Sequence, residues 1–577
     1  LLQIATHFSE TGSRESLAAV PGTVFRTGAG YRSNLPQDHV LDLNGIAYPR
    51  FTEFDLSRYG RRQGLTMLPL LFSRGCINRC GFCSDCHMSF PFRFRRAESV
   101  AEEIAYHYEE NGVRFFRFND LLCNGNLSEL EKLCRLIIEK RLPIQWSSYA
   151  AVREGMTPEL LRTMRKAGCI HLCYGLESAS DRVLKLMNKR YTADVARYVL
   201  ENTHAADIIT AVNLIVGYPG ERERDFRETY DFIKTNQDVI SEITNISTYM
   251  FLPGTDVARD FRGYGIRPRF SFENLKRFCS GKKPAPPPKS FYAREGNTPR
   301  TRMRRVRELV KLVYDAGIIN RIVNYITEDD PGFEEYLRMI KKESSYQAKY
   351  ALRSGICLSR KDVTLALNSR LKKVTIVKRQ TDARKREQLR VLTGHFGFNT
   401  SFCVRGRWVD SSYASWRVTR QEKGLLIDLD WPEFEIRQRW DISRQDDLFA
   451  WHVETACASA GGITCVKAGV FVSPAYTGIY AGGELFSELP PFTEEWQDIN
   501  APDPVPLEFR VLEDGTRLPP FRCDFSASYK AGIQVQTSPR SLQARMASIV
   551  CEIDEKSAEN PLHPTAPPLV FDCRVCV

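Results

Sequence analysis

The chain has 577 residues and a formal net charge of +11. Hydrophobic residues make up 43% and charged residues 26% of it, which excludes a wholly disordered chain because there is enough apolar material for cores of normal size. No stretch approaches the roughly 18 consecutive apolar residues that span a bilayer, so we expect no membrane span.

Residues 1–65 are predicted to be a connector, because glycine and proline interrupt every hydrophobic period there. Leu1 stands where an initiator Met would stand, and no basic-then-apolar leader follows it. We therefore expect the chain to be truncated at its N-terminus.

Between residues 66 and 279, apolar runs of strand length alternate with segments of helical period. Such alternation predicts a parallel sheet with helices outside it, either open or closed into a barrel. Pro69 cannot donate to a ladder of hydrogen bonds, so the first strand is expected at an edge of the sheet. The predicted strands are 67–72, 113–118, 144–149, 170–176, 208–216 and 243–251, and the predicted helices are 98–111, 127–140, 158–166, 180–187, 193–205 and 223–235.

The remaining residues divide into a helical part and a strand-rich part. Residues 280–365 combine a proline-rich linker, which reads KKPAPPPK over 282–289, with a stretch at 301–350 that we predict to be helical. Residues 366–555 contain short β-branched or aromatic runs separated by turn residues, which predicts an antiparallel, sandwich-like domain. Prolines mark 556–577 as a loose tail, where the CxxC string at 573–576 is incidental or a minor redox pair.

Three cysteines follow the first predicted strand at the spacing C-x3-C-x2-C: Cys76, Cys80 and Cys83. A short loop at the carboxyl end of a strand can turn three sulfurs toward one point, and soft thiolates select iron–sulfur clusters or zinc. Three thiolates suit a cubane 4Fe–4S cluster with one iron left without a protein ligand. A structural zinc site that adds Cys86 is the alternative, although zinc sites usually combine two separated C-x2-C units. Residues 83–87 also match a haem-attachment string, but no export signal accompanies it.

With Phe82 before the last cysteine and further motifs in chain order, the sequence resembles the radical S-adenosylmethionine (SAM) superfamily. It resembles most the subgroup that usually carries an N-terminal cobalamin-binding domain. The resemblance covers residues 20–320 and implies a partial (β/α)6 barrel, here followed by the helical segment and the β-rich C-terminal domain. The further motifs are FRFRRAESV at 92–100, Asp120 after the second strand, YGLES at 174–178 with Asn188-Lys189 downstream, GYPGE at 217–221 and PGT at 253–255.

The resemblance also implies the cofactors and their binding residues. In the family, SAM chelates the free iron of the cluster through its amino and carboxylate groups, and one electron splits a carbon–sulfur bond to give a 5′-deoxyadenosyl radical. The backbone at Phe82 would lie near the adenine, Glu177 would bind the methionine amino group, and the turn at 217–220 would let backbone approach the nucleoside closely. The implied metal ligands are Cys76, Cys80 and Cys83, and the implied cofactor-binding residues are Phe82, Asp120, Glu177, Ser178, Gly217, Pro219 and Gly220.

Several of these positions have a purely structural explanation as well. Asp120 could cap a helix, Glu177 could pair with an arginine, and the 217–220 motif could be only a turn. Arg153 and Lys189 are candidate partners for a carboxylate, with solvation at the surface as the alternative.

The sequence also departs from the family's pattern. No Asp-x-His-x-x-Gly motif for cobalamin occurs, so a cobalamin-binding domain is expected upstream of Leu1 or to have been lost. Asn213 stands where the fifth strand of the family often has glycine, which puts an adenine contact there in doubt. Cys86 and Cys123 are extra thiols near the site, which we expect to be inert.

Two features of the C-terminal half, its tryptophans and its basic run, have both a structural and a functional interpretation. Its tryptophans are predicted to fill a sandwich core, with a sugar- or lipid-facing groove as the alternative. The basic run between 370 and 386 is predicted to be a solvated face, with RNA or a phosphate-bearing substrate as the alternative. The tryptophans are Trp408, Trp416, Trp431, Trp440, Trp451 and Trp496.

The sequence thus predicts a cytoplasmic radical SAM enzyme that uses a 4Fe–4S cluster and SAM, and cobalamin if the subgroup holds. It would perform methyl transfer or radical rearrangement on an unidentified small-molecule, lipid or sugar-bearing substrate. Its electrons would come from a donor such as flavodoxin or ferredoxin. The alternatives are an RNA-modifying radical SAM methylthiotransferase, with RNA the less favoured partner, and a non-enzymatic, zinc-stabilised α/β binding protein. No residue that acts on the substrate is predicted.

Overall fold

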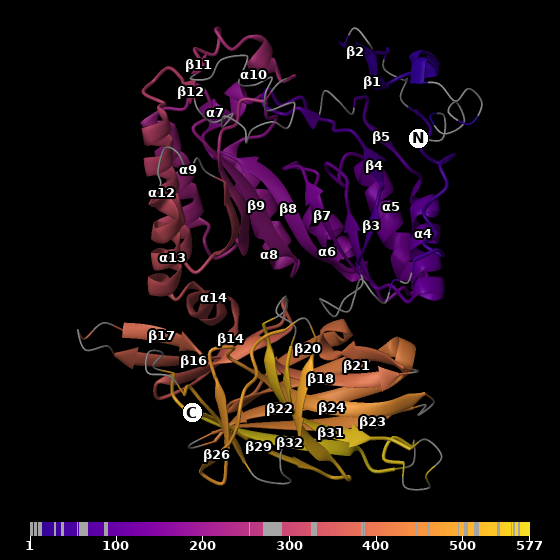
Figure 1. Ribbon diagram of the computed structural model, residues 1–577, viewed down its shortest axis with the longest axis vertical. Coiled ribbons are helices and arrows are strands. Elements are labelled where there is room, and N and C mark those ends of the chain that lie inside the picture. Colours follow the sequence, from indigo (N-terminus) through magenta and orange to yellow (C-terminus); the bar gives the residue numbers. More distant parts are fainter. Residues whose placement is uncertain are drawn as a thin grey trace.

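The computed structural model consists of an α/β part stacked on a β-rich part (Figure 1). In the figure the α/β part, indigo to magenta, lies above the β-rich part, orange to yellow. The structure describes residues 14–27, 30–35, 40–54, 67–85, 90–252, 254–268, 291–324, 332–381 and 387–577, the single residues 4, 9, 56 and 385, and omits from the last range 405, 446–447, 459–461, 494, 501–505, 513–517, 539–542, 555–556, 558–559 and 564–565.

A seven-stranded parallel sheet organises the α/β part, in the order β13-β10-β9-β8-β7-β6-β3. Six of these strands are the six predicted ones, and β3 is an edge strand, as Pro69 predicts. The strands are β3 (Met67–Leu70), β6 (Phe115–Phe118), β7 (Gln145–Ala150), β8 (Cys169–Glu177), β9 (Ile209–Val216), β10 (Glu242–Thr248) and β13 (Ile319–Asn324).

The seventh strand lies in a stretch that the sequence pattern assigns to helices. β13 pairs in parallel with β10, so the prediction of helix throughout 301–350 is wrong. Gly317 follows α12 (Pro299–Asp315) with φ at 69°, a conformation that ends helices, and the β-branched residues after it favour a strand. Helices resume with α13 (Phe333–Ser344) and α14 (Tyr346–Ser354).

Helices pack on one face of the parallel sheet and share an apolar core with it (Figure 1). Asn126, Thr157 and Thr192 cap α5, α6 and α8 by accepting a backbone N–H of the first turn. Gly112, at φ 62°, ends α4 as predicted. The helices are α4 (Ala97–Asn111), α5 (Leu127–Glu139), α6 (Pro158–Lys166), α7 (Asp181–Leu186), α8 (Ala193–Ala205), α9 (Glu223–Thr235) and α10 (Asp256–Arg259).

The β-rich part contains three antiparallel sheets and begins at Ile356, before the predicted boundary at 366. The four-stranded sheet comprises β14 (Ile356–Arg360), β15 (Val363–Asn368), β16 (Lys373–Thr381) and β17 (Glu387–Val391). The six-stranded sheet comprises β19 (Arg407–Asp410), β18 (Thr393–Val404), β24 (Ile463–Val472), β31 (Arg545–Glu552), β30 (Gly532–Thr537) and β27 (Gln497–Asn500). The nine-stranded sheet comprises β20 (Ser415–Arg420), β21 (Gly424–Trp431), β22 (Ile436–Arg444), β23 (Phe449–Cys457), β32 (Leu569–Cys576), β29 (Phe521–Ala527), β28 (Leu507–Arg510), β25 (Gly478–Ala481) and β26 (Glu484–Glu488).

The six- and nine-stranded sheets face each other across one apolar core. Phe398 of β18 stacks on Trp451 of β23 with ring centres 4.7 Å apart, and Phe402 meets Trp431 edge-on at 5.1 Å. Trp440 is fully buried in the same core. This arrangement confirms the predicted strand-rich domain, and these three tryptophans are core residues.

The C-terminal strand β32 lies in the middle of the nine-stranded sheet, between β23 and β29. The interpretation of 556–577 as a loose tail is therefore wrong. The prolines end at Pro568, directly before the strand, and alternate residues of β32 are buried. Cys573 and Cys576 are three residues apart and so lie on opposite faces of the strand, which rules out the redox pair.

Replacing Phe571 with alanine tests whether this end of the chain is part of the core. The side chain is 1% exposed, so we expect the free energy of unfolding to fall by about 3–5 kcal/mol. Denaturant unfolding followed by tryptophan fluorescence measures it. The control is Arg574→Ala, an exposed position of the same strand, which should change stability by no more than about 0.5 kcal/mol. Equal effects of the two substitutions would contradict the assignment.

The β-rich part packs against the amino ends of the parallel strands. The ring of Phe115, at the start of β6, lies 4.9 Å from that of Tyr413. At the start of β7, Nε2 of Gln145 donates to the backbone oxygen of Ser412 at 3.3 Å. The carboxyl ends of the strands, where parallel α/β folds build their sites, therefore face away from this contact.

Candidate active site

The loop that follows β3 carries the three cysteines, and we call residues 73–85 the three-cysteine loop. Asp120, after β6, holds its first residues: the carboxylate accepts hydrogen bonds from the N–H of Phe72 at 3.2 Å, the N–H of Ser73 and the hydroxyl of Ser73 at 2.5 Å. Burial raises the pKa of Asp120 to about 6, against the lowering effect of these bonds. The side chain anchors the loop, which differs from the expected cofactor contact and from a helix cap.

Cys76, Cys80 and Cys83 lie on this loop, with Cys80 buried and the others half-buried. Burial raises the pKa of Cys76, and raises that of Cys80 to about 11. Each of these two thiols also interacts electrostatically with Cys83. Thiols that are withdrawn from water favour a bound metal, because a cation offsets the cost of ionising them.

Three thiolates are the number of ligands that a 4Fe–4S cluster with one open iron needs, whereas a structural zinc site needs a fourth ligand. Within the described residues, no three His, Cys, Asp or Glu side chains are arranged to hold one metal ion. A cubane cluster places each thiolate on a different iron, so it accepts sulfurs that are farther apart than around zinc. Cys86, the fourth ligand of the zinc hypothesis, lies outside the described residues.

A cavity of about 240 Å³ lies between the three-cysteine loop and the carboxyl ends of β8, β9 and β10. Four buried polar oxygens of its lining residues have no hydrogen-bond partner in the described structure: Oδ1 of Asn213, Oδ1 of Asn245, Oγ1 of Thr248 and Oη of Tyr249. Unpaired buried polar atoms are rare and indicate a bound molecule or water. The cavity is lined by Phe82, Cys83, Ser84, Asp85, Glu177, Asn213, Leu214, Ile215, Asn245, Ser247, Thr248, Tyr249, Met250 and Leu252.

Two of the residues predicted to bind the cofactor line this cavity, namely Phe82 and Glu177. Glu177 ends β8 with φ at 62°, and its Oε1 lies 3.6 Å from Nζ of Lys189. Burial raises the pKa of Glu177, and Lys189 opposes that effect. Glu177 therefore pairs with a lysine, where an arginine was the structural alternative. The side chain of Lys189 is buried, so the surface-solvation alternative for it is wrong.

The other predicted cofactor residues face protein in the described structure and are not among the cavity's lining residues. The hydroxyl of Ser178 is 3.1 Å from that of Thr229. Gly217 has φ at 81°, and a Cβ there would lie 2.1 Å from Cδ of Arg302, so its close approach is to α12. Gly220, at φ 86°, packs near Leu186, and Pro219 is buried in the same turn.

Asn213 and Asn245 are directly opposite on β9 and β10. Asn213 is noticed in the sequence only as a departure from the family, and Asn245, Thr248 and Tyr249 are missed. The sequence signal that could have found these residues is weak. It is a polar residue among apolar neighbours in a strand that helices bury.

The extra thiol Cys123 is almost fully buried, and burial raises its pKa to about 12, which fits the expectation that it is inert. Arg153 donates to the backbone oxygen of Gly125 at 3.1 Å and is not placed in the cavity lining. Pro253, in the predicted PGT motif, lies outside the described residues.

Two residues of the basic run between 370 and 386 are paired within the protein, one of them across the contact between the two parts. Nε of Arg370 lies 2.8 Å from Asp207, and the buried Nζ of Lys372 donates to the backbone oxygens of Ser412 and Ala414 at 2.7 and 2.6 Å. Neither a solvated face nor an RNA-binding surface describes these two residues.

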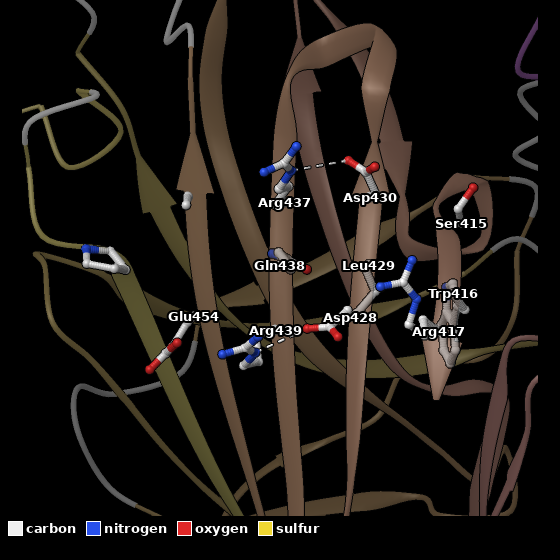
Figure 2. A pocket seen from close by; sticks show the side chains of 12 residues that line it. Ser415, Trp416, Arg417, Asp428, Leu429, Asp430, Arg437, Gln438, Arg439 and Glu454 are labelled. Atoms are coloured by element: carbon white, nitrogen blue, oxygen red, sulfur yellow. Dashed lines mark hydrogen bonds and ion pairs between the residues drawn. The ribbon is translucent and has the colours of Figure 1, made fainter. Parts of the chain in front are cut away.

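A second cavity, of about 580 Å³, lies on the outer face of the nine-stranded sheet (Figure 2). Its charges pair across neighbouring strands: Arg439 lies 3.1 Å from Asp428 and Arg437 lies 3.9 Å from Asp430. Such cross-strand pairs are typical of a sheet face in water. Trp416 lines this cavity, donates its indole N–H to the backbone oxygen of Ser411 at 2.7 Å and meets Trp440 edge-on with ring centres 5.2 Å apart.

Residues 70–233 match the family model described as the radical SAM superfamily. The anaerobic magnesium-protoporphyrin IX monomethyl ester cyclase of Cereibacter sphaeroides is 30% identical over 193 residues, 33% of this chain and 31% of the cyclase. The ribosomal protein uS12 methylthiotransferase RimO of Acetivibrio thermocellus is 31% identical over 175 residues, 29% of this chain and 38% of that protein. The radical S-adenosylmethionine methyltransferase TsrM from Kitasatospora setae matches in structure with a TM-score of 0.38 and 19% identity, over 47% of this chain and 54% of TsrM.

Residues 70–233, which include the three-cysteine loop and the sheet strands from β6 to β9, are therefore similar to the radical SAM superfamily, which is the resemblance predicted from the sequence. The chain spans about a third of the length of the first curated relatives it matches. Among the described helices, none is long and apolar enough to cross a membrane.

Proposed function

We propose that this protein is a radical SAM enzyme in which Cys76, Cys80 and Cys83 hold a 4Fe–4S cluster and the adjoining cavity holds SAM. The observation that carries the proposal is the cavity beside the thiols, with its four unpartnered oxygens. The family match of residues 70–233 supports the same cofactors.

When bound, the cluster and SAM supply a one-electron cleavage that yields a 5′-deoxyadenosyl radical. The chain's own residues bind and orient. Phe82 offers an apolar wall for the adenine, and Glu177 a carboxylate for the methionine amino group. The oxygens of Asn213 and Asn245 are acceptors for hydroxyl or amino groups of the bound molecule.

In this proposal Asp120, Ser178 and the turn with Gly217, Pro219 and Gly220 act indirectly. Asp120 holds the start of the three-cysteine loop, and Ser178 holds the chain directly after Glu177. The turn after β9 is held by Glu221, whose Oε2 accepts the N–H of Gly217 at 2.8 Å. They are positioning residues for the cofactor site.

The reaction we propose is methyl transfer or radical rearrangement on a small-molecule, lipid or sugar-bearing substrate. The match of residues 70–233 to the radical SAM superfamily supports this class of chemistry. An electron donor such as flavodoxin or ferredoxin would reduce the cluster. Many of the described cysteines are free thiols, which supports a reducing compartment such as the cytoplasm.

Anaerobic reconstitution with iron and sulfide, followed by reduction and addition of SAM, tests the proposal. We expect 5′-deoxyadenosine, or a methylated product, to form in amounts that depend on both the reductant and the cluster. Protein that carries a full cluster and leaves SAM intact would contradict it.

A further inference from the structure

Lys189 follows a segment that is hydrogen-bonded to the three-cysteine loop. The N–H of Gly81 donates to the backbone oxygen of Met187 at 3.0 Å, and Nδ2 of Asn188 donates to the backbone oxygen of Arg79 at 2.6 Å. Asn188 has φ at 60°, which turns the chain directly after α7. These bonds fix Lys189 next to the stretch between Cys76 and Cys83.

The ammonium group of Lys189 is buried, with its side chain 9% exposed. Nζ donates to the backbone oxygen of Gly175 at 2.8 Å, lies 3.6 Å from Oε1 of Glu177 and is 5.6 Å from the ring centre of Phe82. An ammonium has three donors, of which one binds the backbone oxygen of Gly175 and another faces Glu177. The group can therefore interact with a further acceptor at the site.

The same ammonium acts on the thiols. The ammonium interacts electrostatically with Cys76 and Cys80, and the carboxylate of Glu177 interacts with Cys80 with the opposite sign. A charge in a poorly solvated site interacts over several ångströms with little screening.

Gly175, in the YGLES motif, leaves the space that this pair of charges occupies. A Cβ at position 175 would lie 2.8 Å from Oε1 of Glu177 and 3.3 Å from Nζ of Lys189. The residue lies within β8 and does not have a positive φ, so space explains the glycine better than backbone conformation does.

We propose that Lys189 sets the reduction potential of the cluster site by placing its positive charge beside the three cysteines. This inference rests on the proposed function. A cluster gains one negative charge when it is reduced, and a neighbouring cation stabilises that form, so the ammonium raises the potential. Lys189 is thus a positioning residue that acts through the cluster.

The test is a redox titration of the reconstituted full chain, followed by electron paramagnetic resonance. Lys189→Met should lower the ratio of reduced to oxidised cluster at a fixed potential at least tenfold, equivalent to a shift of about 59 mV for one electron. Lys189→Arg, which keeps the charge, should stay within about twofold of wild type. Gly175→Ala, which displaces the pair without changing the charge, should lower the ratio by a smaller factor.

Arg190→Met is the matched control, because it removes the same charge from the next, exposed residue. It should leave the titration unchanged, and an effect equal to that of Lys189→Met would overturn the proposal. An unchanged titration of Lys189→Met would overturn it too. If Lys189→Met loses the cluster while Lys189→Arg keeps it, the result supports a need for the positive charge at position 189. If both variants lose the cluster, the titration of Gly175→Ala is the test: a lower ratio of reduced to oxidised cluster supports the proposal, and an unchanged ratio overturns it. A wild-type chain without any cluster would instead refute the proposed function.

Discussion

Replacing any one of Cys76, Cys80 and Cys83 with alanine is expected to abolish the iron–sulfur cluster and the formation of 5′-deoxyadenosine. With two thiolates left, a second iron of the cube loses its protein ligand, and such a cluster is not retained. We expect iron to fall from about four atoms per reconstituted chain to below about one, with loss of the brown absorbance. Metal analysis and absorption spectra measure both.

Cys86→Ala is the control for these three variants, because it distinguishes the cluster from a four-cysteine zinc site. A 4Fe–4S cluster bound by three thiolates does not need Cys86, so this variant should retain its iron and its activity. If all four variants lose the bound metal equally, and that metal is zinc, the assignment of the three-cysteine loop is wrong.

Arg305→Met is expected to cause one of the largest losses of stability in the α/β part. Arg305 and Glu221 are both almost fully buried, and they form an ion pair 2.7 Å long that supports the turn after β9. Removing one partner of a buried pair leaves an uncompensated charge, which costs about 3–5 kcal/mol. Denaturant unfolding at pH 8 measures the loss.

The effect of Arg305→Met should also depend on pH. Burial raises the folded-state pKa of Glu221 from 4.5 to about 7, with Arg305 opposing it. The wild type therefore loses stability from this group as the pH rises from about 4.5 to about 7, because the folded state holds the proton longer. Without Arg305 the folded pKa rises further and the loss extends to higher pH. The gap between variant and wild type should be larger at pH 8 than at pH 5.

Arg304→Met is the matched control for Arg305→Met. Arg304 is exposed and pairs at the surface with Glu223 and Glu308 at 2.7 and 2.6 Å. Surface pairs contribute little, so we expect a change of at most about 1 kcal/mol with little dependence on pH. Equal effects of the two substitutions would show that the buried pair has no special role.

The parallel sheet could be predicted from the sequence because its strands are buried by helices and read as apolar runs of strand length. Two of the strands that were missed, β13 and β32, lack such a signal. β13 is a six-residue strand directly after a long helix, and its place is set by pairing with β10, more than 70 residues earlier. β32 follows a group of prolines, and only its pairing with β23 and β29 makes it a core strand.

The site was predictable where its residues are close in sequence. The three cysteines and Phe82 fall within one loop, so their spacing alone indicates their chemistry. Asn213 and Asn245 meet only through the register of β9 and β10, which single-sequence patterns do not fix. Asp120 contacts Ser73, which is 47 positions earlier in the sequence. The sequence therefore predicts that Asp120 belongs to the site, but it does not predict that the side chain of Asp120 holds the three-cysteine loop.

The most direct test of the central claim, that three thiolates leave one iron open for SAM, is the electron paramagnetic resonance spectrum of the reduced protein with and without SAM. We predict the signal of a reduced 4Fe–4S cluster, and we predict that this signal changes when SAM is added. An equal concentration of adenosine, which lacks the methionine part of SAM, should leave the signal unchanged. A cluster signal that SAM does not alter, or purified protein that holds only zinc after anaerobic reconstitution, would contradict the claim.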